Sequence, residues 1–414
     1  PYRAGIYLGS RGHGRPATCP GLFPPTGRDR EWSGHGNCRH SGFGNPKGKP
    51  RHMKIAFFGL KEFSDYFKIG GFESFIRRLA TGLSNSDNMV EYVLYDSPAD
   101  SSIEVLPNLT ISYFQDFAKA FQRLRTGGYD HIFRVWLSRA DRLKYLFLQR
   151  SFKQNIRWHH LFLAWPASFP KRLMTILEGF FSAPNGLLVC VSPRQYQAIS
   201  RFHPIARQIF PPVPEAYFLS PQNKKLENKI RVTFLGNLTK DKFIEEIIDL
   251  FHRLQKSQKF HFSIFGTYDR LNRHSASIHE TLQSQDEIEY VNVDMNNYST
   301  EVDLLVENVL KNTDVFVQPY RTLNNTLEIP LLLLEAMASL CPVITTDIGS
   351  VSEVYGNSQF IIPLQEFPAR AEALLNELSL EQLMAERERI NKRNLELKFN
   401  MTNVIDEFQY LLTK

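Results

Sequence analysis

Short apolar runs alternate with segments of helical periodicity from Met53 to the end of the chain. The pattern predicts strands over 54–58, 90–95, 129–136, 186–191, 230–235, 260–265, 315–318 and 343–346. It predicts helices over 72–83, 111–125, 244–255, 331–340 and 400–412. Such alternation is typical of parallel sheets whose strands are joined by crossover helices. We therefore predict an α/β protein with two Rossmann-like, doubly wound parallel-sheet domains.

A proline-rich stretch at 210–214, followed by the polar stretch 220–229, has the composition of a linker between domains. We predict an N-terminal domain over 53–214, a C-terminal domain over 215–396, and a final segment, 397–414, whose helix crosses back to the N-terminal domain. Two such domains leave a cleft between the carboxyl ends of their strands. Open parallel sheets bind ligands in that place.

The formal net charge of +6 comes from the first 52 residues, which hold nine of the basic residues and two of the acidic ones. The remaining chain has 40 basic and 41 acidic residues, so it lacks the footprint of a nucleic-acid-binding protein. The same leader holds 11 of the 23 glycines and no apolar periodicity, and we predict that it is disordered. It reads as vector-derived or translated upstream sequence, and a functional basic arm is the alternative.

The cysteines and the hydropathy of the chain indicate in which cellular compartment the protein lies. Cys190 and Cys341 stand singly inside apolar runs, which predicts buried thiols in a reducing compartment. The most apolar window, 329–346, is interrupted by Glu335 and Pro342 and is too short for a membrane span. We expect a cytoplasmic protein, with peripheral attachment to the inner face of the membrane as a further expectation.

Two glycine-bearing loops could receive phosphate. Gly70 and Gly71 end the loop after the first predicted strand and open a helix, where bare backbone N–H groups and the helix dipole favour an anion. Gly236 ends the first strand of the second domain, and Lys242 follows six residues later, where it can reach a diphosphate. A plain turn and a solvated lysine are the alternatives.

The segment from Leu327 to Ala338 provides a third candidate site. The start of its helix, at Pro330, Leu331 and Leu332, exposes N–H groups for a phosphate, and Glu335 one turn further on can accept hydrogen bonds from a ribose. A carboxylate among leucines and alanines is costly without a partner. A structural ion pair or an exposed position is the alternative for Glu335.

Together these segments resemble glycosyltransferase family 4, a class of retaining enzymes with the two-domain GT-B fold. The resemblance covers nearly all of the chain from Met53. Gly70–Glu73 resembles the family's G-G-x-E, and the segment 236–242 resembles its diphosphate-binding G-R-L-x-x-x-K-G. The segment 331–338 resembles the second half of its E-x7-E motif, and Asp347–Ser350 with Glu353 resembles the motif that closes the site. The resemblance implies an N-terminal acceptor domain with Glu73 on the acceptor side. It also implies a C-terminal donor domain in which Glu335 binds the ribose.

Two positions depart from the family pattern. Asn237 replaces the arginine that holds the diphosphate, and we hypothesise that Arg321 supplies the missing charge. Leu327 stands where the first glutamate of the E-x7-E motif is expected, with Glu328 next to it. Glu328 is therefore the candidate for contact with the transferred sugar, and the identity of that sugar stays open.

The family also keeps a histidine near the transferred sugar at the end of a strand of the N-terminal domain. His159 and His160 are the candidates, because the carboxyl end of a strand starting at Ile156 would point them into the cleft. We favour His160 as the catalytic histidine and place His159 on the acceptor side. A core or surface histidine is the alternative.

The chain contains no D-x-D and no cluster with the spacing of metal ligands, so we expect transfer without a metal or cofactor. The expected reaction moves a hexose from a UDP- or GDP-linked donor to a glycan or lipid-linked acceptor, with retention, in polysaccharide or envelope glycan synthesis. Basic residues interleaved with aromatic ones over 143–165 could dock on anionic lipids, or could form a packed helix pair. Two rival functions stay open. One is a nucleotide-sugar 2-epimerase or phosphorylase, which shares the fold class, and the other is a non-catalytic nucleotide-sugar or carbohydrate-binding protein.

Overall fold

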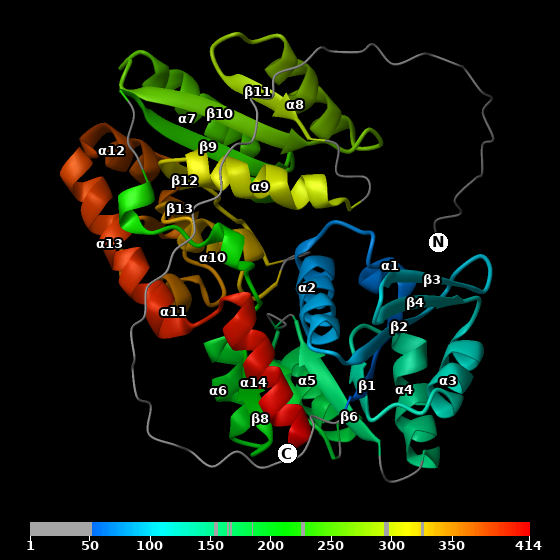
Figure 1. Ribbon diagram of the computed structural model, residues 1–414. Coiled ribbons are helices and arrows are strands. Elements are labelled where there is room, and N and C mark those ends of the chain that lie inside the picture. Colours follow the sequence, from blue (N-terminus) through cyan, green and yellow to red (C-terminus); the bar gives the residue numbers. More distant parts are fainter. Residues whose placement is uncertain are drawn as a thin grey trace, which may run out of the picture. The chain divides into compact units, whose positions relative to one another are not determined.

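The computed structural model describes residues 52–152, 156–163, 165, 168–183, 185–224, 228–293, 298–323 and 327–414 (Figure 1). The leader predicted to be disordered, apart from His52, lies outside the described residues. Arg51–Lys414 form one compact unit, and both sheets belong to it.

The first sheet contains β1 (Lys54–Leu60), β2 (Met89–Tyr95), β3 (Ser101–Leu106), β4 (Leu109–Phe114), β5 (His131–Arg134), β6 (Arg157–Phe162), β7 (Leu188–Cys190) and β8 (Ala206–Gln208). The second sheet contains β9 (Ile230–Asn237), β10 (Phe260–Thr267), β11 (Glu289–Asn292), β12 (Val315–Val317), β13 (Val343–Thr346) and β14 (Ile361–Ile362).

The helices between strands of the first sheet, or directly after them, are α1 (Lys61–Ser64), α2 (Gly71–Asn85), α3 (Phe117–Thr126), α4 (Arg139–Leu148), α5 (Phe169–Ser182) and α6 (Pro193–Ser200). Those of the second half are α7 (Ile244–Gln255), α8 (Arg273–Gln283), α9 (Thr300–Asn312), α10 (Leu331–Ala338), α11 (Val351–Tyr355), α12 (Ala369–Glu377), α13 (Leu380–Leu397) and α14 (Met401–Thr413). Short 3₁₀ helices are η1 (Gln149–Ser151), η2 (Glu215–Tyr217), η3 (Pro221–Asn223), η4 (Lys240–Lys242) and η5 (Leu364–Glu366).

Both sheets have the doubly wound topology that the sequence predicts. The strand order is β3-β4-β2-β1-β5-β6-β7-β8 in the first sheet and β11-β10-β9-β12-β13-β14 in the second. All neighbouring pairs are parallel except β3 and β4. The direction of winding reverses between β1 and β5, and again between β9 and β12. In open sheets the carboxyl ends of such strand pairs form the ligand crevice.

One predicted helix is wrong in its first part. Residues expected to begin a helix at 111 belong to β4, which pairs along its whole length with β2. Apolar Ile111 and Tyr113 alternate with Thr110 and Ser112, which is the period of a strand. The helix α3 starts only after Asp116, whose side chain accepts a hydrogen bond from the Lys119 N–H at 2.9 Å.

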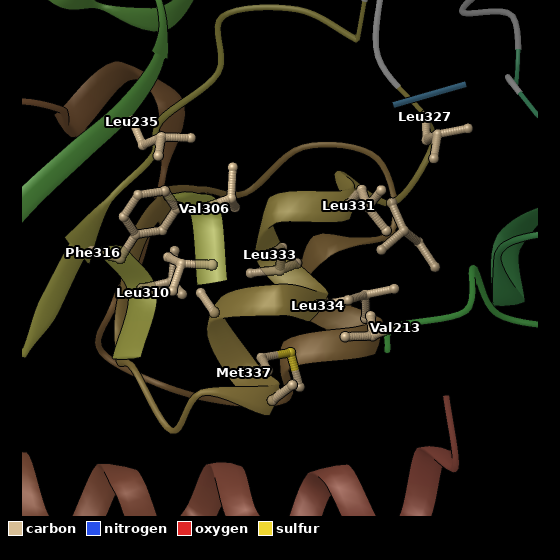
Figure 2. Packing of buried hydrophobic residues seen from close by; sticks show 14 of the residues in the cluster. Val213, Leu235, Val306, Leu310, Phe316, Leu327, Leu331, Leu333, Leu334 and Met337 are labelled. Atoms are coloured by element: carbon tan, nitrogen blue, oxygen red, sulfur yellow. The ribbon is translucent and has the colours of Figure 1, made fainter. Parts of the chain in front are cut away.

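The helix α10 lies inside the second half of the molecule and is apolar on nearly all sides. Figure 2 shows Leu333, Leu334 and Met337 of this helix among Phe316 of β12 and Leu310 of α9. An α-helix that is apolar all round is a buried helix. Glu335 therefore enters a region where an ionised group needs a partner.

The last helix, α14, returns to the first sheet. The Phe408 ring lies 6.0 Å from the Phe133 ring of β5, and the Arg157 guanidinium at the start of β6 donates to the Leu412 carbonyl at 3.3 Å. Cys190 and Cys341 are buried and unpaired, as predicted.

Candidate functional site

Two neighbouring cavities lie at the carboxyl ends of the strands where the winding of each sheet reverses. The smaller has a volume of about 200 Å³ and the larger about 1030 Å³. They share Ile69, Gly70, Gly71 and Asn237 as walls. The structure thus brings together residues that are far apart in the sequence.

The smaller cavity is lined by most of the residues predicted to bind a donor. These are Gly70, Gly71, Gly236, Asn237, Lys242, Leu331, Leu332 and Glu335. Pro330 and Arg321 do not line it. Gly236 has a φ of +149°, which disfavours a side chain at this end of β9.

Lys242 is a half-buried cation in this cavity. It ends η4, and its Nζ lies 3.3 Å from the centre of the Tyr320 ring. Burial lowers the pKa of Lys242 to about 7. Its burial distinguishes Lys242 from the solvated first-turn lysine that was the alternative. Because Lys242 also has no ion pair with a described carboxylate, its ammonium can bind an anion.

Glu335 lines a cavity and also forms an ion pair, so it has features of both the predicted binding site and the structural alternative. Its side chain lines the smaller cavity, and its Oε1 lies 2.5 Å from Nη2 of Arg78 on α2. Asp303 of α9 lies 3.7 Å from the same guanidinium, and Nη1 donates to the Pro212 carbonyl at 3.4 Å. Burial raises the pKa of Glu335, and the charge of Arg78 opposes that shift. The carboxylate expected to bind ribose is thus also the partner of a buried arginine.

Sequence reasoning missed Arg77 and Arg78, both of which line the smaller cavity. Arg77 donates to the carbonyls of Tyr66 and Lys68 at 3.1 and 3.0 Å and so holds the loop before Gly70. Two consecutive arginines on the apolar face of the predicted helix 72–83 were the available signal. Buried charges on such a face require partners across the packing surface.

Arg321, which we hypothesised to hold the diphosphate, does not line the smaller cavity. Its guanidinium forms an ion pair with Glu246, donates to the Lys240 carbonyl at 2.9 Å and lies 3.8 Å from the centre of the Phe243 ring. It lines the larger cavity. Around the smaller cavity the cations are Lys242, Arg77 and Arg78.

Glu73, which we predicted on the acceptor side, lines the larger cavity. Its carboxylate is folded back so closely over Gly70 that a Cβ on Gly70 would lie 2.2 Å from Oε2. Burial raises the pKa of Glu73. Glycine at position 70 therefore makes room for the carboxylate of Glu73.

Glu328 is 1% exposed and does not line either cavity. Among the described residues, neither of its carboxylate oxygens has a hydrogen-bond partner, and Nη1 of Arg194 is 3.8 Å from Oε1. Burial raises the pKa of Glu328 to about 7. The neighbouring Leu327 packs against Gly71 instead. Glu328 thus stands behind the cleft, close to Arg194.

The histidines do not reach the cleft, so the expectation for their strand is wrong. His159 and His160 sit in the middle of β6 rather than at its carboxyl end. His159 bonds His131 at 2.9 Å and accepts a hydrogen bond from the Leu187 N–H at 2.9 Å. His160 accepts from Nε of Arg134 at 3.1 Å and lines a separate cavity of about 150 Å³. Burial lowers the pKa of both histidines. They behave as core histidines.

The aromatic and basic segment 143–165 is largely packed. Tyr145, Trp158, Phe162 and Trp165 are buried, so the alternative of internal packing describes them. Exposed apolar side chains lie on α4, inside this segment, and on α5, which follows it. They are Leu143, Phe147 and Leu148, and Phe169, Leu173, Met174, Leu177 and Phe181.

Among the residues that the structure describes, no three His, Cys, Asp or Glu side chains gather into a candidate metal site. In the same part of the chain, every helix is too short or too polar to cross a bilayer.

Residues 229–379 match a family model described as Glycosyl transferases group 1. A comparison with curated protein sequences gives no match. Among solved structures, sucrose-phosphate synthase from Thermosynechococcus elongatus is similar with a TM-score of 0.64 and 16% identity, covering 87% of this chain and 98% of that one.

Two further solved structures share the fold. HepE from Anabaena, solved in complex with UDP-glucose, gives a TM-score of 0.60 at 13% identity, over 87% of this chain and 100% of that one. The catalytic domain of starch synthase IV from Arabidopsis thaliana, bound to ADP and acarbose, gives 0.57 at 12% identity, over 87% and 99%. The predicted fold class is confirmed: the protein has the GT-B fold, and residues 229–379 form a glycosyltransferase group 1 domain, which indicates a transferase enzyme.

Proposed function

We propose that the protein transfers a hexose from a nucleotide diphosphate sugar, UDP- or GDP-linked, to a glycan or lipid-linked acceptor, with retention and without a metal ion. The observation that carries this proposal is the composition of the smaller cavity. Among the described residues, two carboxylates, Glu335 and Asp303, and three cations, Lys242, Arg77 and Arg78, surround it next to the start of α10. These groups match the two polar parts of a sugar nucleotide, a diol and a diphosphate.

The diphosphate would lie between Lys242 and the backbone N–H groups of Leu331 and Leu332, which begin α10 and line the cavity. A helix start and a lysine both favour negative charge. When the bond between the sugar and the diphosphate breaks, these groups stabilise the charge that develops on the leaving oxygen. The cations of the chain then perform the part that a metal ion has in other transferases.

The transferred sugar would lie where the two cavities meet, against Gly70, Gly71 and Asn237. The acceptor hydroxyl enters from the larger cavity. Its oxygen forms a bond to the anomeric carbon, the bond from that carbon to the diphosphate breaks, and the hydroxyl proton passes to the leaving phosphate. Attack on the same face as the leaving group retains the anomeric configuration.

The helix α5 supports a membrane-bound or membrane-proximal acceptor. Phe169, Leu173, Leu177 and Phe181 recur every fourth residue and are 75%, 47%, 44% and 48% exposed. Residues spaced by four lie on one face of a helix. A helix with such a face and basic residues beside it can lie in the interface of a bilayer. We include peripheral membrane attachment in the proposal.

The test is a screen of UDP-, GDP- and ADP-linked sugars with EDTA present. The readouts are thermal stabilisation of the protein and release of the nucleotide diphosphate. One donor should stabilise the protein and be hydrolysed slowly. Glu335→Ala should lose both effects, whereas Glu301→Ala, exposed on α9 outside the cavity, should keep them. Loss of both effects in EDTA with recovery in Mg²⁺ would contradict the metal-free proposal.

Binding of a donor without any turnover would move the conclusion to the rival function, a non-catalytic nucleotide-sugar or carbohydrate-binding protein. Once an acceptor is known, the anomeric proton coupling in the NMR spectrum of the product decides between retention and inversion.

A further inference from the structure

One wall of the larger cavity carries three cations, and two of them, Lys171 and Arg194, have unused hydrogen-bond donors among the described residues. Lys171 and Arg172 belong to the first turn of α5, and Arg194 to the first turn of α6. In the described part of the chain, the Lys171 ammonium makes no hydrogen bond or ion pair. The 3.8 Å approach to Glu328 is the one ion pair of the Arg194 guanidinium among the described residues, and it is longer than a hydrogen bond.

Arg194 and Arg172 both influence the same buried carboxylate. Nη1 of Arg194 lies 3.8 Å from Oε1 of Glu328, and the positive charges of both arginines oppose the rise in the pKa of Glu328 that burial causes. Glu328 is buried and, in the described part of the chain, accepts no hydrogen bond, so Arg194 keeps its donors available for a ligand in the cavity that it lines. An anion in the cavity would meet charge from two helices at once.

Carboxylates do not cancel this charge. Glu62 and Glu73 are the acidic residues that line the larger cavity, against Lys68, Arg321 and the three cations of the α5 and α6 wall. Glu73 is folded over Gly70, next to the smaller cavity. The Lys68 ammonium donates to the Glu62 backbone carbonyl at 2.7 Å. The cavity therefore carries an excess of positive charge.

Aromatic rings form a second wall. Phe63 and Phe72 pack against Trp136, with ring centres 5.4 and 6.0 Å apart, and Trp165 also lines the cavity. Flat apolar rings beside polar groups are suited to the apolar face of a sugar ring or to a lipid chain. A cationic wall next to an aromatic wall selects a ligand that has both an anionic and an apolar part.

We propose that the larger cavity binds an acceptor that carries a phosphate. Its phosphate lies on Lys171, Arg172 and Arg194, and its sugar lies on the aromatic wall with one hydroxyl toward Gly71. The proposal rests on the proposed function, because it names the acceptor of the same reaction. Phosphate matches several separate cations better than a single carboxylate does, since it offers more acceptor oxygens.

The test uses inorganic phosphate as the probe and tryptophan fluorescence as the readout. Trp136 and Trp165 line the cavity and are two of the four tryptophans of the chain. The variants are the double substitution Lys171→Ala/Arg194→Ala and, as a matched control, Arg201→Ala, which is exposed at the end of α6. Lys242→Ala is included because the smaller cavity could also take phosphate.

The wild type, Arg201→Ala and Lys242→Ala should show a saturable change in fluorescence with phosphate. The double variant should bind roughly tenfold more weakly or worse, because two charge-assisted contacts are lost. The proposal is overturned if the double variant binds like the wild type, if Lys242→Ala alone removes the signal, or if phosphate binds nowhere. Circular dichroism of the double variant verifies that it is folded.

Competition then identifies the source of the phosphate. Displacement of the probe by glucose 6-phosphate indicates a soluble sugar phosphate, and displacement by vesicles of phosphatidic acid in phosphatidylcholine indicates a lipid phosphate. Pure phosphatidylcholine vesicles are the control. Because the probe titration needs no donor, a silent sugar-nucleotide screen with intact phosphate binding would count against the proposed transfer and leave the phosphate site standing.

Discussion

Arg78 on α2 and Glu335 on α10 form a buried ion pair, with 2.5 Å between Nη2 and Oε1. The pair joins a helix of the first sheet to a helix of the second, at the wall of the smaller cavity. Removal of one partner leaves the other charge buried and alone, and that is the costly state of a buried ion pair. The ribose-binding candidate therefore also holds the two sheets together.

We expect Arg78→Ala to destabilise the protein by about 3–5 kcal/mol, the range for one partner lost from a buried pair. The double variant Arg78→Met/Glu335→Gln should be more stable than Arg78→Ala, since Glu335 no longer leaves a charge buried and alone. Asp303, the second partner of Arg78, is partly exposed and keeps its hydrogen bond from the Tyr298 hydroxyl. Urea unfolding followed by circular dichroism measures both. If the double variant is the less stable one, the ion pair is not the main contribution of Arg78.

Donor affinity should depend on pH through Lys242. With a pKa of about 7, this lysine is mostly charged at about pH 6 and mostly neutral at about pH 8.5 in the empty protein. A diphosphate binds the charged form, so the affinity should fall as pH rises through 7. Lys242→Arg keeps its charge throughout and should show a flat profile. Titration calorimetry of the selected donor at several pH values measures this affinity. A wild-type affinity that does not change with pH would contradict this role of Lys242.

Arg321→Ala should leave donor affinity almost unchanged, because its guanidinium pairs with Glu246 and lines the other cavity. Lys242→Ala should weaken the same donor roughly tenfold to a hundredfold. Both values come from the same calorimetric assay. A severe loss in Arg321→Ala would restore our sequence-based hypothesis for that residue.

Glu328 should make stability depend on pH. Its folded pKa of about 7 lies above the ordinary value of 4.5, so its favourable contribution is fully present below about 4.5 and is lost as pH rises through 7. Glu328→Gln cannot ionise, and its stability relative to wild type should improve by up to about 3 kcal/mol between about pH 5 and 8. Melting temperatures across this range test it, with Glu301→Gln as the exposed control. A difference that does not change with pH would contradict the buried, unpaired state.

Attachment to anionic vesicles should depend on the apolar face of α5. Leu173→Glu/Leu177→Glu places charge on that face and should weaken sedimentation with phosphatidylglycerol vesicles by roughly tenfold or more. Leu271→Glu is the control, because Leu271 is 94% exposed and lies in the second half of the chain. If both variants lose vesicle binding equally, the added negative charge alone explains the loss. If the wild type does not bind the vesicles, the membrane proposal is wrong.

Most of the fold could be predicted from local pattern. The helix 244–255 and the strand 343–346 have the predicted bounds, because an amphipathic stripe and a short β-branched run each specify their element locally. The region 111–125 could not be divided correctly, since β4 depends on pairing with β2. Strand pairing is a property of distant segments, and local periodicity reports it poorly.

The sequence by itself determined the two doubly wound sheets, and it indicated Gly70, Gly236, Lys242 and Glu335 as site candidates, because glycines and charges at strand and helix ends have local causes. The structure places these four residues around one cavity. Only the tertiary structure decided which charges meet. Arg78 and Glu335 are 257 positions apart, and Arg321 turned to Glu246 instead of the smaller cavity. The position of His160 within its strand was also decided by the fold. His160 lies in the middle of β6 and lines neither the smaller nor the larger cavity. Partners of buried charges are chosen by packing between distant elements, and the order of residues along the chain does not encode that choice directly.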